Sequence, residues 1–199
     1  TEEKLRKYRQ AGVNRLSIGL QSVNDEELRL LGRIHTYEEF REAYHLARVN
    51  GFSNINVDLI SAIPGQTVES WRRTLEQVMA LSPEHISAYS LILEEGTTFY
   101  KKYVEDKAKE GPKLPDEDAE RQMYWDTETL MEKNGYHRYE ISNYAKEGYA
   151  CRHNLGYWER IPYLGFGIGA ASLVPGDLIG KCRKLEGKMS RYTNPDQLR

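Results

Sequence analysis

Short apolar runs alternate with helical segments along the first half of the chain. Apolar side chains recur at helical spacing in four segments that begin at capping residues or end at glycines, and three runs between them are rich in apolar and β-branched residues. These patterns predict helices over residues 2–11, 25–31 and 36–50 and from residue 67, and strands over residues 15–20, 55–60 and 85–92. Strands that alternate with helices pair in parallel with right-handed crossovers. The pattern fits both an open doubly wound sheet and part of a βα barrel.

The second half of the chain has a different pattern. Residues 101–109 are densely charged, which predicts a solvated helix or linker, and glycines and prolines follow directly. We place a domain boundary here, and expect a first domain over residues 1–100 and a second over residues 101–199. Asp116 is the expected N-cap of a long helix that ends at Gly135. The last third is rich in aromatic residues and glycine, which predicts irregular chain and strands rather than a helical bundle.

Composition and charge argue against several classes of protein. The formal net charge of -2 over 199 residues predicts neither a nucleic-acid partner nor a membrane-surface patch. No apolar run approaches the roughly 20 residues that span a bilayer, and the first residues lack the apolar core of a signal peptide. Two cysteines, Cys151 and Cys182, are too few for a disulfide framework or a thiolate-only metal site, so we expect a cytoplasmic protein. The lack of an initiator Met indicates a fragment of a longer protein.

Polar side chains follow or interrupt the predicted strands. Gln21 follows the first strand, and Asn56 and Asp58 interrupt the apolar run of the second. In parallel α/β folds, ligands bind beyond the carboxyl ends of the strands, and a carboxylate within an apolar strand is unfavourable unless it is paired or binds a ligand. Asp58 is therefore the strongest candidate for a ligand-binding residue, and Gln21 is a weaker one. The alternative is that Asp58 caps a neighbouring backbone or pairs with Arg33.

The stretch over residues 151–158 concentrates more ligand chemistry than any other segment. It contains a thiol, the imidazole of His153, a carboxamide and two large aromatic side chains. A neutral imidazole is a common ligand of metals and of haem iron, and Tyr and Trp present flat faces that suit a porphyrin plane. The alternative is an ordinary half-buried histidine beside core aromatics. The glycines within residues 165–169 lack the context of a dinucleotide-binding loop and predict a strand whose backbone approaches a ligand or another strand.

Several short motifs resemble one known family. Four motifs in the first half are similar to those of the radical S-adenosylmethionine (radical SAM) family, in particular its oxygen-independent coproporphyrinogen III oxidase-like group. They lie at residues 17–22, 31–35, 55–60 and 64–67. Three further motifs resemble the haem-chaperone branch of that group, known as HemW. They lie at residues 94–100, 139–145 and 153–158.

The resemblance implies a fold and two sets of ligand-binding residues. The expected fold is α/β, with the later strands of a partial (β/α)6 radical SAM barrel followed by a smaller α+β C-terminal region. S-adenosylmethionine would be contacted by residues at the strand ends, namely Gln21, Arg33, Asp58 and Ile92. Haem would be bound by the last motif, through Asn154, Tyr157, Trp158 and His153, the expected iron ligand.

The chain departs from the family in one respect. The Cys-x3-Cys-x2-Cys motif that holds a [4Fe–4S] cluster in the family does not occur in it, so these residues alone would not cleave S-adenosylmethionine reductively. The first functional hypothesis is a haem chaperone that passes haem to an unidentified acceptor protein, with a membrane-associated acceptor as one candidate. The alternative is an oxygen-independent coproporphyrinogen III oxidase, which leaves open whether the protein is an enzyme. A third hypothesis is a truncated domain that binds neither ligand.

Overall fold

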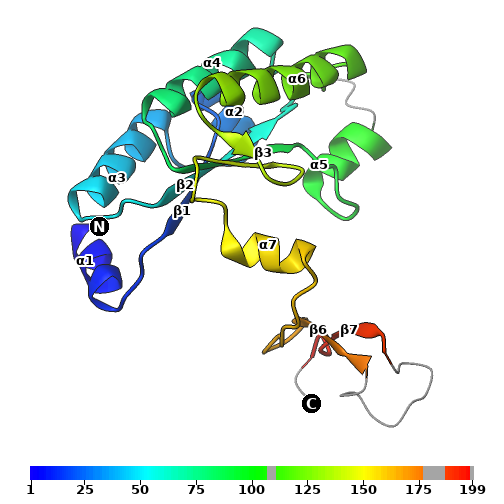
Figure 1. Cartoon of the computed structure of the whole chain (residues 1–199). Coiled ribbons are helices and arrows are strands. Elements are labelled where there is room, and N and C mark those ends of the chain that lie inside the picture. The colour runs from blue at the N-terminus through cyan, green and yellow to red at the C-terminus, as the bar shows by residue number, and fades with distance from the viewer. Residues whose placement is uncertain (107–110, 177–186, 198–199) are drawn as a thin grey trace. The chain divides into compact units, whose positions relative to one another are not determined.

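The computed structural model describes residues 1–106, 111–176 and 187–197 (Figure 1). The chain separates into two compact units, Thr1–Ala150 and Cys151–Arg199. The first unit carries the strand-end motifs, and the second carries the motif at residues 153–158. Cys182 lies outside the described residues.

The first unit alternates helices and strands in the order that the sequence predicts. Its helices are α1 (Glu2–Gln10), α2 (Asp25–Leu30), α3 (Tyr37–Val49), α4 (Val68–Ala80), α5 (Thr98–Tyr100), the π-helical η1 (Lys101–Glu105) and α6 (Glu117–Lys133). Its strands are β1 (Leu16–Gln21), β2 (Ile55–Ser61), β3 (His85–Ser90), β4 (His137–Arg138) and β5 (Asn143–Ala145). The helices and strands predicted for the first half are all present, with small shifts at their ends.

Parallel pairing of β1, β2 and β3 forms the main part of a five-stranded sheet in the order β1-β2-β3-β5-β4. β5 pairs antiparallel with β3, and β4 pairs antiparallel with β5. Figure 1 shows α3, α4 and α6 along one side of this sheet. The alternation of parallel strands and helices confirms the α/β class.

The two faces of this sheet differ in polarity, because successive side chains of a strand point to opposite faces. Val57, Leu59 and Ile86 belong to the apolar face and are fully buried in the hydrophobic core. Trp71 of α4 is buried in the same cluster, where its indole nitrogen donates to Thr127 Oγ1 of α6 over 2.9 Å. The helices therefore cover the apolar face, and the opposite face carries polar side chains.

Local capping signals explain why the helices begin where the sequence predicts. Thr36 and Glu39 form a complete capping box at the start of α3. The side chains of Asn24, Thr67 and Asp116 each accept a backbone N–H from the first turn of the helix that follows. Each cap lies beside the helix that it begins, so short stretches of sequence are enough to locate these helices.

Glu27 of α2 is a buried carboxylate that the sequence analysis does not identify. It is only 4% exposed and accepts hydrogen bonds from Ser22 Oγ, Gln66 Nε2 and Ser70 Oγ over 2.6, 2.8 and 2.5 Å. Ser22 follows β1, whereas Gln66 lies just before α4 and Ser70 lies in its first turn. The carboxylate therefore ties α2 to the end of β1 and to the region around the start of α4, which is distant in sequence.

We expect Glu27→Ala to lower the free energy of unfolding by about 3 kcal/mol, because three polar groups lose their shared acceptor inside the protein. Urea unfolding followed by circular dichroism measures this change. Glu38→Ala is the control, since Glu38 pairs with Arg41 on the exposed surface of α3 and its loss is expected to change stability by less than about 0.5 kcal/mol. Equal losses in the two variants would contradict the role assigned to Glu27.

The second unit contains α7 (Arg152–Trp158) and a two-stranded antiparallel sheet of β6 (Ala171–Pro175) and β7 (Met189–Thr193). Helix α7 corrects the expectation of irregular chain and strands at these residues. Two features of the sequence conceal the helix. Gly156 lies inside it and lowers its helix propensity, and the N-cap Cys151 makes no side-chain capping hydrogen bond.

The glycines within residues 165–169 lie in a loop and turn, not in the strand that the sequence predicts. The predicted close backbone approach does occur, because a Cβ at Gly165 would lie 2.2 Å from the carbonyl oxygen of Ala171. Gly167 and Gly169 have φ angles of 96° and 66°, which favour a turn over a strand. The run therefore reverses the chain just before β6.

The division between the two units lies later in the chain than the boundary expected near residue 100. Helix α6 packs against α4, and β5 pairs with β3, so residues 117–145 belong to the compact first unit. The assignment of residues 1–100 and 101–199 to separate domains stays a prediction.

Candidate functional site

The polar face of the sheet in the first unit brings together side chains from three parallel strands. Ser17 of β1 pairs in register with Asn56 of β2, and Asn56 pairs with His85 of β3. In the next row, Asp58 of β2 pairs with Ser87 of β3. Residues that pair in register, or lie two positions apart on one strand, share a face of the sheet. These five residues therefore form two adjacent polar rows.

The carboxylate of Asp58 is held by two neighbours on this face. Its Oδ2 accepts a hydrogen bond from Ser17 Oγ over 2.9 Å, and its Oδ1 accepts one from Asn56 Nδ2 over 2.8 Å. Asn56 Nδ2 also donates to Ser17 Oγ over 2.7 Å, which closes a triangle of three side chains. Within the described residues, Asp58 forms no ion pair with Arg33, the alternative that the sequence left open. A carboxylate offers about four lone-pair positions, so it can accept further donors from a ligand.

Gln21 lies at the same end of the polar face. It is buried and has a left-handed backbone with φ 75°, directly after an irregularity in the pairing of β1 with β2. Its Nε2 lies so close to Gly19 that a Cβ on that glycine would be 2.7 Å away. Gly19 pairs in register with Asp58. The structure therefore brings Gln21 and Asp58 together, and a side chain at position 19 would displace the carboxamide of Gln21.

The other two residues expected to contact S-adenosylmethionine lie outside the strands. Arg33 follows α2 and is exposed, and Ile92 follows β3 and is 77% exposed. Within the described chain, no hydrogen bond joins either side chain to Gln21 or Asp58. The roles of Arg33 and Ile92 stay predictions.

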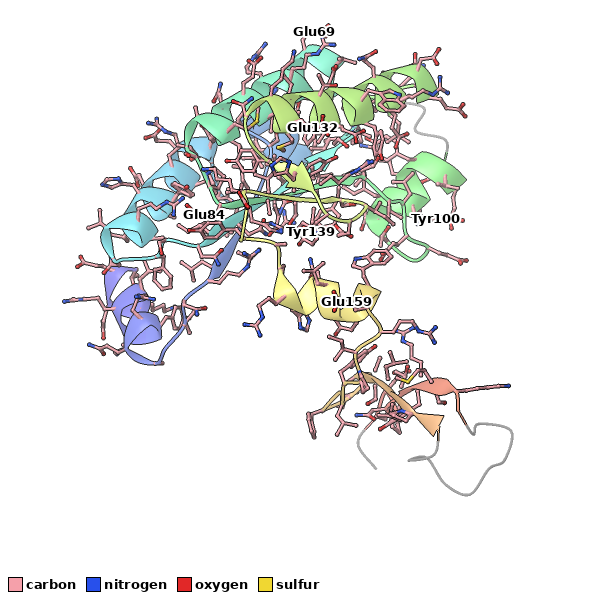
Figure 2. The ribbon with its side chains drawn as sticks, in the orientation of Figure 1. Glu69, Glu84, Tyr100, Glu132, Tyr139 and Glu159 are labelled. Atoms are coloured by element: carbon pink, nitrogen blue, oxygen red, sulfur yellow. The ribbon has the colours of Figure 1, made fainter. Side chains whose placement is uncertain are left out.

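His85 is a buried histidine that the sequence analysis gives no role. It is 1% exposed, with Nδ1 2.6 Å from Asn56 Oδ1 and Nε2 2.7 Å from the hydroxyl of Tyr139, which Figure 2 labels in the loop between β4 and β5. Burial, and to a lesser extent the positive charge of Arg15, lowers the pKa of His85 to about 3, so the ring is neutral near pH 7. His85 is identified as part of the polar face because it pairs in register with Asn56. This pairing is known only once the strands are assembled into the sheet.

We expect the stability of the first unit to fall as the pH drops from about 6.5 toward 3. Between the usual histidine pKa of 6.5 and the folded value of about 3, the unfolded chain binds a proton at His85 that the folded chain does not. The free energy of unfolding should therefore decrease by up to about 1.4 kcal/mol per pH unit from this residue. Urea unfolding at several pH values measures the slope. His85→Gln, which does not titrate, is expected to reduce it, and an unchanged slope would contradict the assignment.

Helix α7 in the second unit presents His153 and Tyr157 one turn apart. Their rings meet edge to face, with centroids 4.9 Å apart and an angle of 89°, and Tyr157 meets Tyr163 in the same manner at 4.8 Å and 74°. These three residues line a shallow cavity of about 220 Å³ together with Gly156 and Ile161. We call this feature the histidine–tyrosine groove.

The other residues of the predicted haem motif differ in whether they line this groove. Trp158 is 55% exposed and does not line the groove, whereas Tyr157 is 47% exposed and does. Asn154 is half-buried on α7. The structure thus joins His153 and Tyr157 and adds Tyr163, which no local pattern identifies because its contact with Tyr157 depends on the fold of the second unit.

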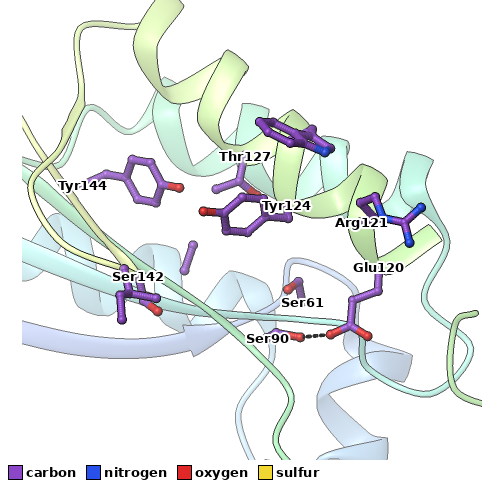
Figure 3. Close-up of a pocket in the computed structure, with 11 residues that line it drawn as sticks. Ser61, Ser90, Glu120, Arg121, Tyr124, Thr127, Ser142 and Tyr144 are labelled. Carbon is purple, nitrogen blue, oxygen red and sulfur yellow. Dashed lines mark hydrogen bonds between the residues drawn. The ribbon is translucent and has the colours of Figure 1, made fainter. Parts of the chain in front are cut away.

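A further cavity of about 330 Å³ lies in the first unit between α6 and the ends of β2 and β3 (Figure 3). Figure 3 shows Tyr124 of α6 and Tyr144 of β5 among the residues that line it, and Ser90 Oγ donates to Glu120 Oε1 over 2.5 Å. None of the residues predicted to bind S-adenosylmethionine or haem lines it. Tyr144 shares a face with Ile86, so the cavity opens on the opposite side of the sheet from Asp58.

The part of the chain that the structure describes contains neither a cluster of metal-binding side chains nor a membrane-spanning helix. No group of three His, Cys, Asp or Glu side chains there is arranged to hold a metal ion. The described residues therefore do not supply a ligand set for a [4Fe–4S] cluster. No helix among them is long and apolar enough to cross a membrane.

Comparison with known proteins identifies similar sequences and structures. Residues 1–78 match the family model of the radical SAM superfamily. The heme chaperone HemW of Haemophilus influenzae is 43% identical over 168 residues, which cover 84% of this chain and 42% of that protein. The heme chaperone HemW of Bacillus subtilis is 40% identical over 174 residues, which cover 87% of this chain and 45% of that protein. The chain thus spans less than half the length of these relatives.

A solved structure supports the same grouping. Coproporphyrinogen III oxidase (HemN) from Escherichia coli, described as a radical SAM enzyme, matches 86% of this chain and 41% of its own with a TM-score of 0.69 and 25% sequence identity. This likeness bears out the expected fold class, in which part of a radical SAM sheet precedes a smaller C-terminal region. The chain therefore belongs to the radical SAM superfamily.

Proposed function

We propose that the protein is a haem chaperone, which binds haem through α7 and passes it to an acceptor protein. The histidine–tyrosine groove carries this proposal, because it places an exposed imidazole beside two aromatic rings. A neutral imidazole is an effective axial ligand for haem iron, and aromatic rings pack well against a porphyrin. The relatives named heme chaperone HemW, at 43% and 40% identity, support the same function.

The size of the groove supports a carrier rather than an enclosed cofactor site. Its volume of about 220 Å³ lies below the roughly 300–1,000 Å³ of pockets that enclose a small ligand. We therefore assign one edge of the porphyrin to the groove, with the iron at His153 and with Trp158 offering a further apolar face outside it. A ligand that stays partly open to solvent is accessible to a second protein.

S-adenosylmethionine is the cofactor that the polar face of the first unit fits. The carboxylate of Asp58 can accept hydrogen bonds from ribose hydroxyls, and the carboxamide of Gln21 can both donate and accept beside it. Arg33 would pair with the carboxylate of the methionine part, and Ile92 would contact the adenine. In this family the cofactor supplies a 5′-deoxyadenosyl radical when a [4Fe–4S] cluster is present, and the described residues lack ligands for that cluster.

A haemin titration tests the proposal. We expect the Soret band of haemin to shift on addition of the chain, and the shift to saturate near one equivalent of haemin per chain. The absence of a shift would contradict haem binding.

The second candidate function is that of an oxygen-independent coproporphyrinogen III oxidase. The likeness to HemN, with a TM-score of 0.69, favours it. The two functions differ in their products, because an oxidase forms protoporphyrinogen from coproporphyrinogen III and a chaperone does not. An assay of the full-length protein with reconstituted cluster, S-adenosylmethionine and reductant distinguishes them, and we expect no protoporphyrinogen.

The acceptor and the cellular location stay predictions from the sequence. An open groove supports direct transfer to an acceptor protein, whether that acceptor is membrane-associated or not. The expectation of a cytoplasmic protein rests on the small number of cysteines.

A further inference from the structure

The motif at residues 139–145 has no role in the proposed function, yet its tyrosine is connected to Asp58. The hydroxyl of Tyr139 lies 2.7 Å from His85 Nε2, and His85 Nδ1 lies 2.6 Å from Asn56 Oδ1. Asn56 Nδ2 lies 2.8 Å from Asp58 Oδ1. A continuous chain of three hydrogen bonds thus runs across the polar face, from the loop between β4 and β5 to the carboxylate on β2.

The carboxylate at one end determines the direction of every bond in this chain. An ionised Asp58 only accepts, so the Asn56 atom that faces it is the amide nitrogen. The amide oxygen of Asn56 then faces His85, which requires the ring proton on Nδ1. In the neutral ring Nε2 becomes the acceptor, and the hydroxyl of Tyr139 donates to it. All three donors therefore point toward Asp58.

Burial makes these bonds effective. Asn56 is 5% exposed and His85 is 1% exposed, so water competes little with the bonds between them. Aligned hydrogen bonds in such surroundings polarise and strengthen one another. Ser87 Oγ adds a second donor to Asn56 Oδ1 over 3.2 Å, which further holds the amide in one orientation.

The loop that supplies Tyr139 is itself ordered by the next residue of the motif. Glu140 Oε1 accepts hydrogen bonds from the backbone N–H of Ser142 over 3.0 Å and from Asn143 Nδ2 over 2.5 Å. Asn143 is 4% exposed and begins β5, which pairs with β3. The motif therefore anchors its own tyrosine to the sheet.

We infer that Tyr139, His85 and Asn56 are positioning residues, which hold the carboxylate of Asp58 in the orientation that binds the ribose hydroxyls of S-adenosylmethionine. This inference rests on the proposed use of Asp58 as a cofactor-binding residue. It assigns a function in cofactor binding to the motif at residues 139–145, although Tyr139 acts only through His85 and Asn56. A purely structural role would stabilise the sheet and leave ligand affinity unchanged.

Two tyrosines of the first unit provide a matched pair for the test. Tyr139 donates to His85 over 2.7 Å, and Tyr136 donates to the carbonyl oxygen of Pro83 over 2.7 Å. The variants Tyr139→Phe and Tyr136→Phe each remove one hydroxyl near the start of β3, and both are expected to lower the melting temperature. Only Tyr139→Phe breaks the chain to Asp58.

The readout is the affinity for S-adenosylhomocysteine, which carries the same adenosine, measured by isothermal titration calorimetry on the full-length protein. We expect Tyr139→Phe to weaken binding about fivefold, Asn56→Ala at least about tenfold, and Tyr136→Phe not at all. Unchanged affinity in Tyr139→Phe, or equal loss in both tyrosine variants, would overturn the inference while leaving the cofactor site intact. Failure of the unmutated protein to bind would overturn the cofactor site and the inference together.

Nitrogen NMR of the histidine ring supplies a second readout, which needs no ligand. The inferred chain requires His85 to carry its proton on Nδ1 and to leave Nε2 unprotonated as an acceptor. We expect long-range proton–nitrogen spectra to show this tautomer in the unmutated protein. A ring protonated at Nε2 would reverse the direction of the chain and overturn the inference.

Discussion

Replacing His153 by alanine is expected to weaken haem binding about 100-fold, which corresponds to roughly 2.8 kcal/mol. His153 is exposed on α7, and its ring contacts that of Tyr157 at the rim of the histidine–tyrosine groove. Alanine removes the imidazole, the one nitrogen donor among the three rings of this groove. The two tyrosines remain, and they provide packing alone. A haemin titration followed by absorption spectroscopy measures the loss, since the Soret shift of histidine-ligated haem should disappear.

Two control variants separate ligation from other effects of the substitution. His137→Ala removes another exposed histidine, on β4 in the first unit, and is expected to leave the titration unchanged. Tyr163→Phe keeps the ring that contacts Tyr157 and removes its hydroxyl, so it should change affinity by less than about threefold. A Soret shift that survives His153→Ala would contradict the assignment of His153 as the iron ligand.

The second large effect is expected at Asp58. We expect Asp58→Asn to weaken the binding of S-adenosylhomocysteine by about 10- to 100-fold, because hydrogen bonds to a charged acceptor contribute roughly 1.5–3 kcal/mol. The substituted carboxamide has one oxygen, so it cannot accept from Ser17, Asn56 and two ribose hydroxyls in the way that the carboxylate can. Calorimetric titration of the full-length variant measures the change.

A charge-matched control distinguishes this effect from a general change in charge. Asp118→Asn removes one negative charge from α6, where the side chain of Asp118 is 90% exposed and pairs with Arg121. It is expected to leave both affinity and stability unchanged. If Asp58→Asn bound S-adenosylhomocysteine as tightly as the unmutated protein, Asp58 would have no role in the cofactor site.

The longer helices and the three parallel strands of the first unit are predictable because their signals are local. The capping box of Thr36 and Glu39, and the cap at Asp116, lie beside the helices that they begin. Asp58 is conspicuous for a similar reason, since an acidic residue interrupts an apolar strand. In each case a few neighbouring residues contain the information.

The hydrogen-bonded chain on the polar face is not predictable in this way. His85 and Tyr139 are 54 residues apart, and they meet because the short strand β5 joins β3 antiparallel. A strand of three residues has too short a pattern to detect, and its pairing depends on the rest of the sheet. Helix α7 is concealed by an internal glycine at Gly156, so the helical arrangement of His153 and Tyr157 also emerges only in the folded unit.

The location of bound haem is the most direct test of the proposed function. Ferric haem broadens the NMR signals of nearby backbone amides, and the effect is read from proton–nitrogen spectra of the chain with and without haemin, with zinc protoporphyrin as a diamagnetic control. We expect broadening centred on residues 152–163, which contain α7 and the histidine–tyrosine groove. Broadening centred on the sheet of β1, β2 and β3, or spread evenly along the chain, would contradict haem binding at α7.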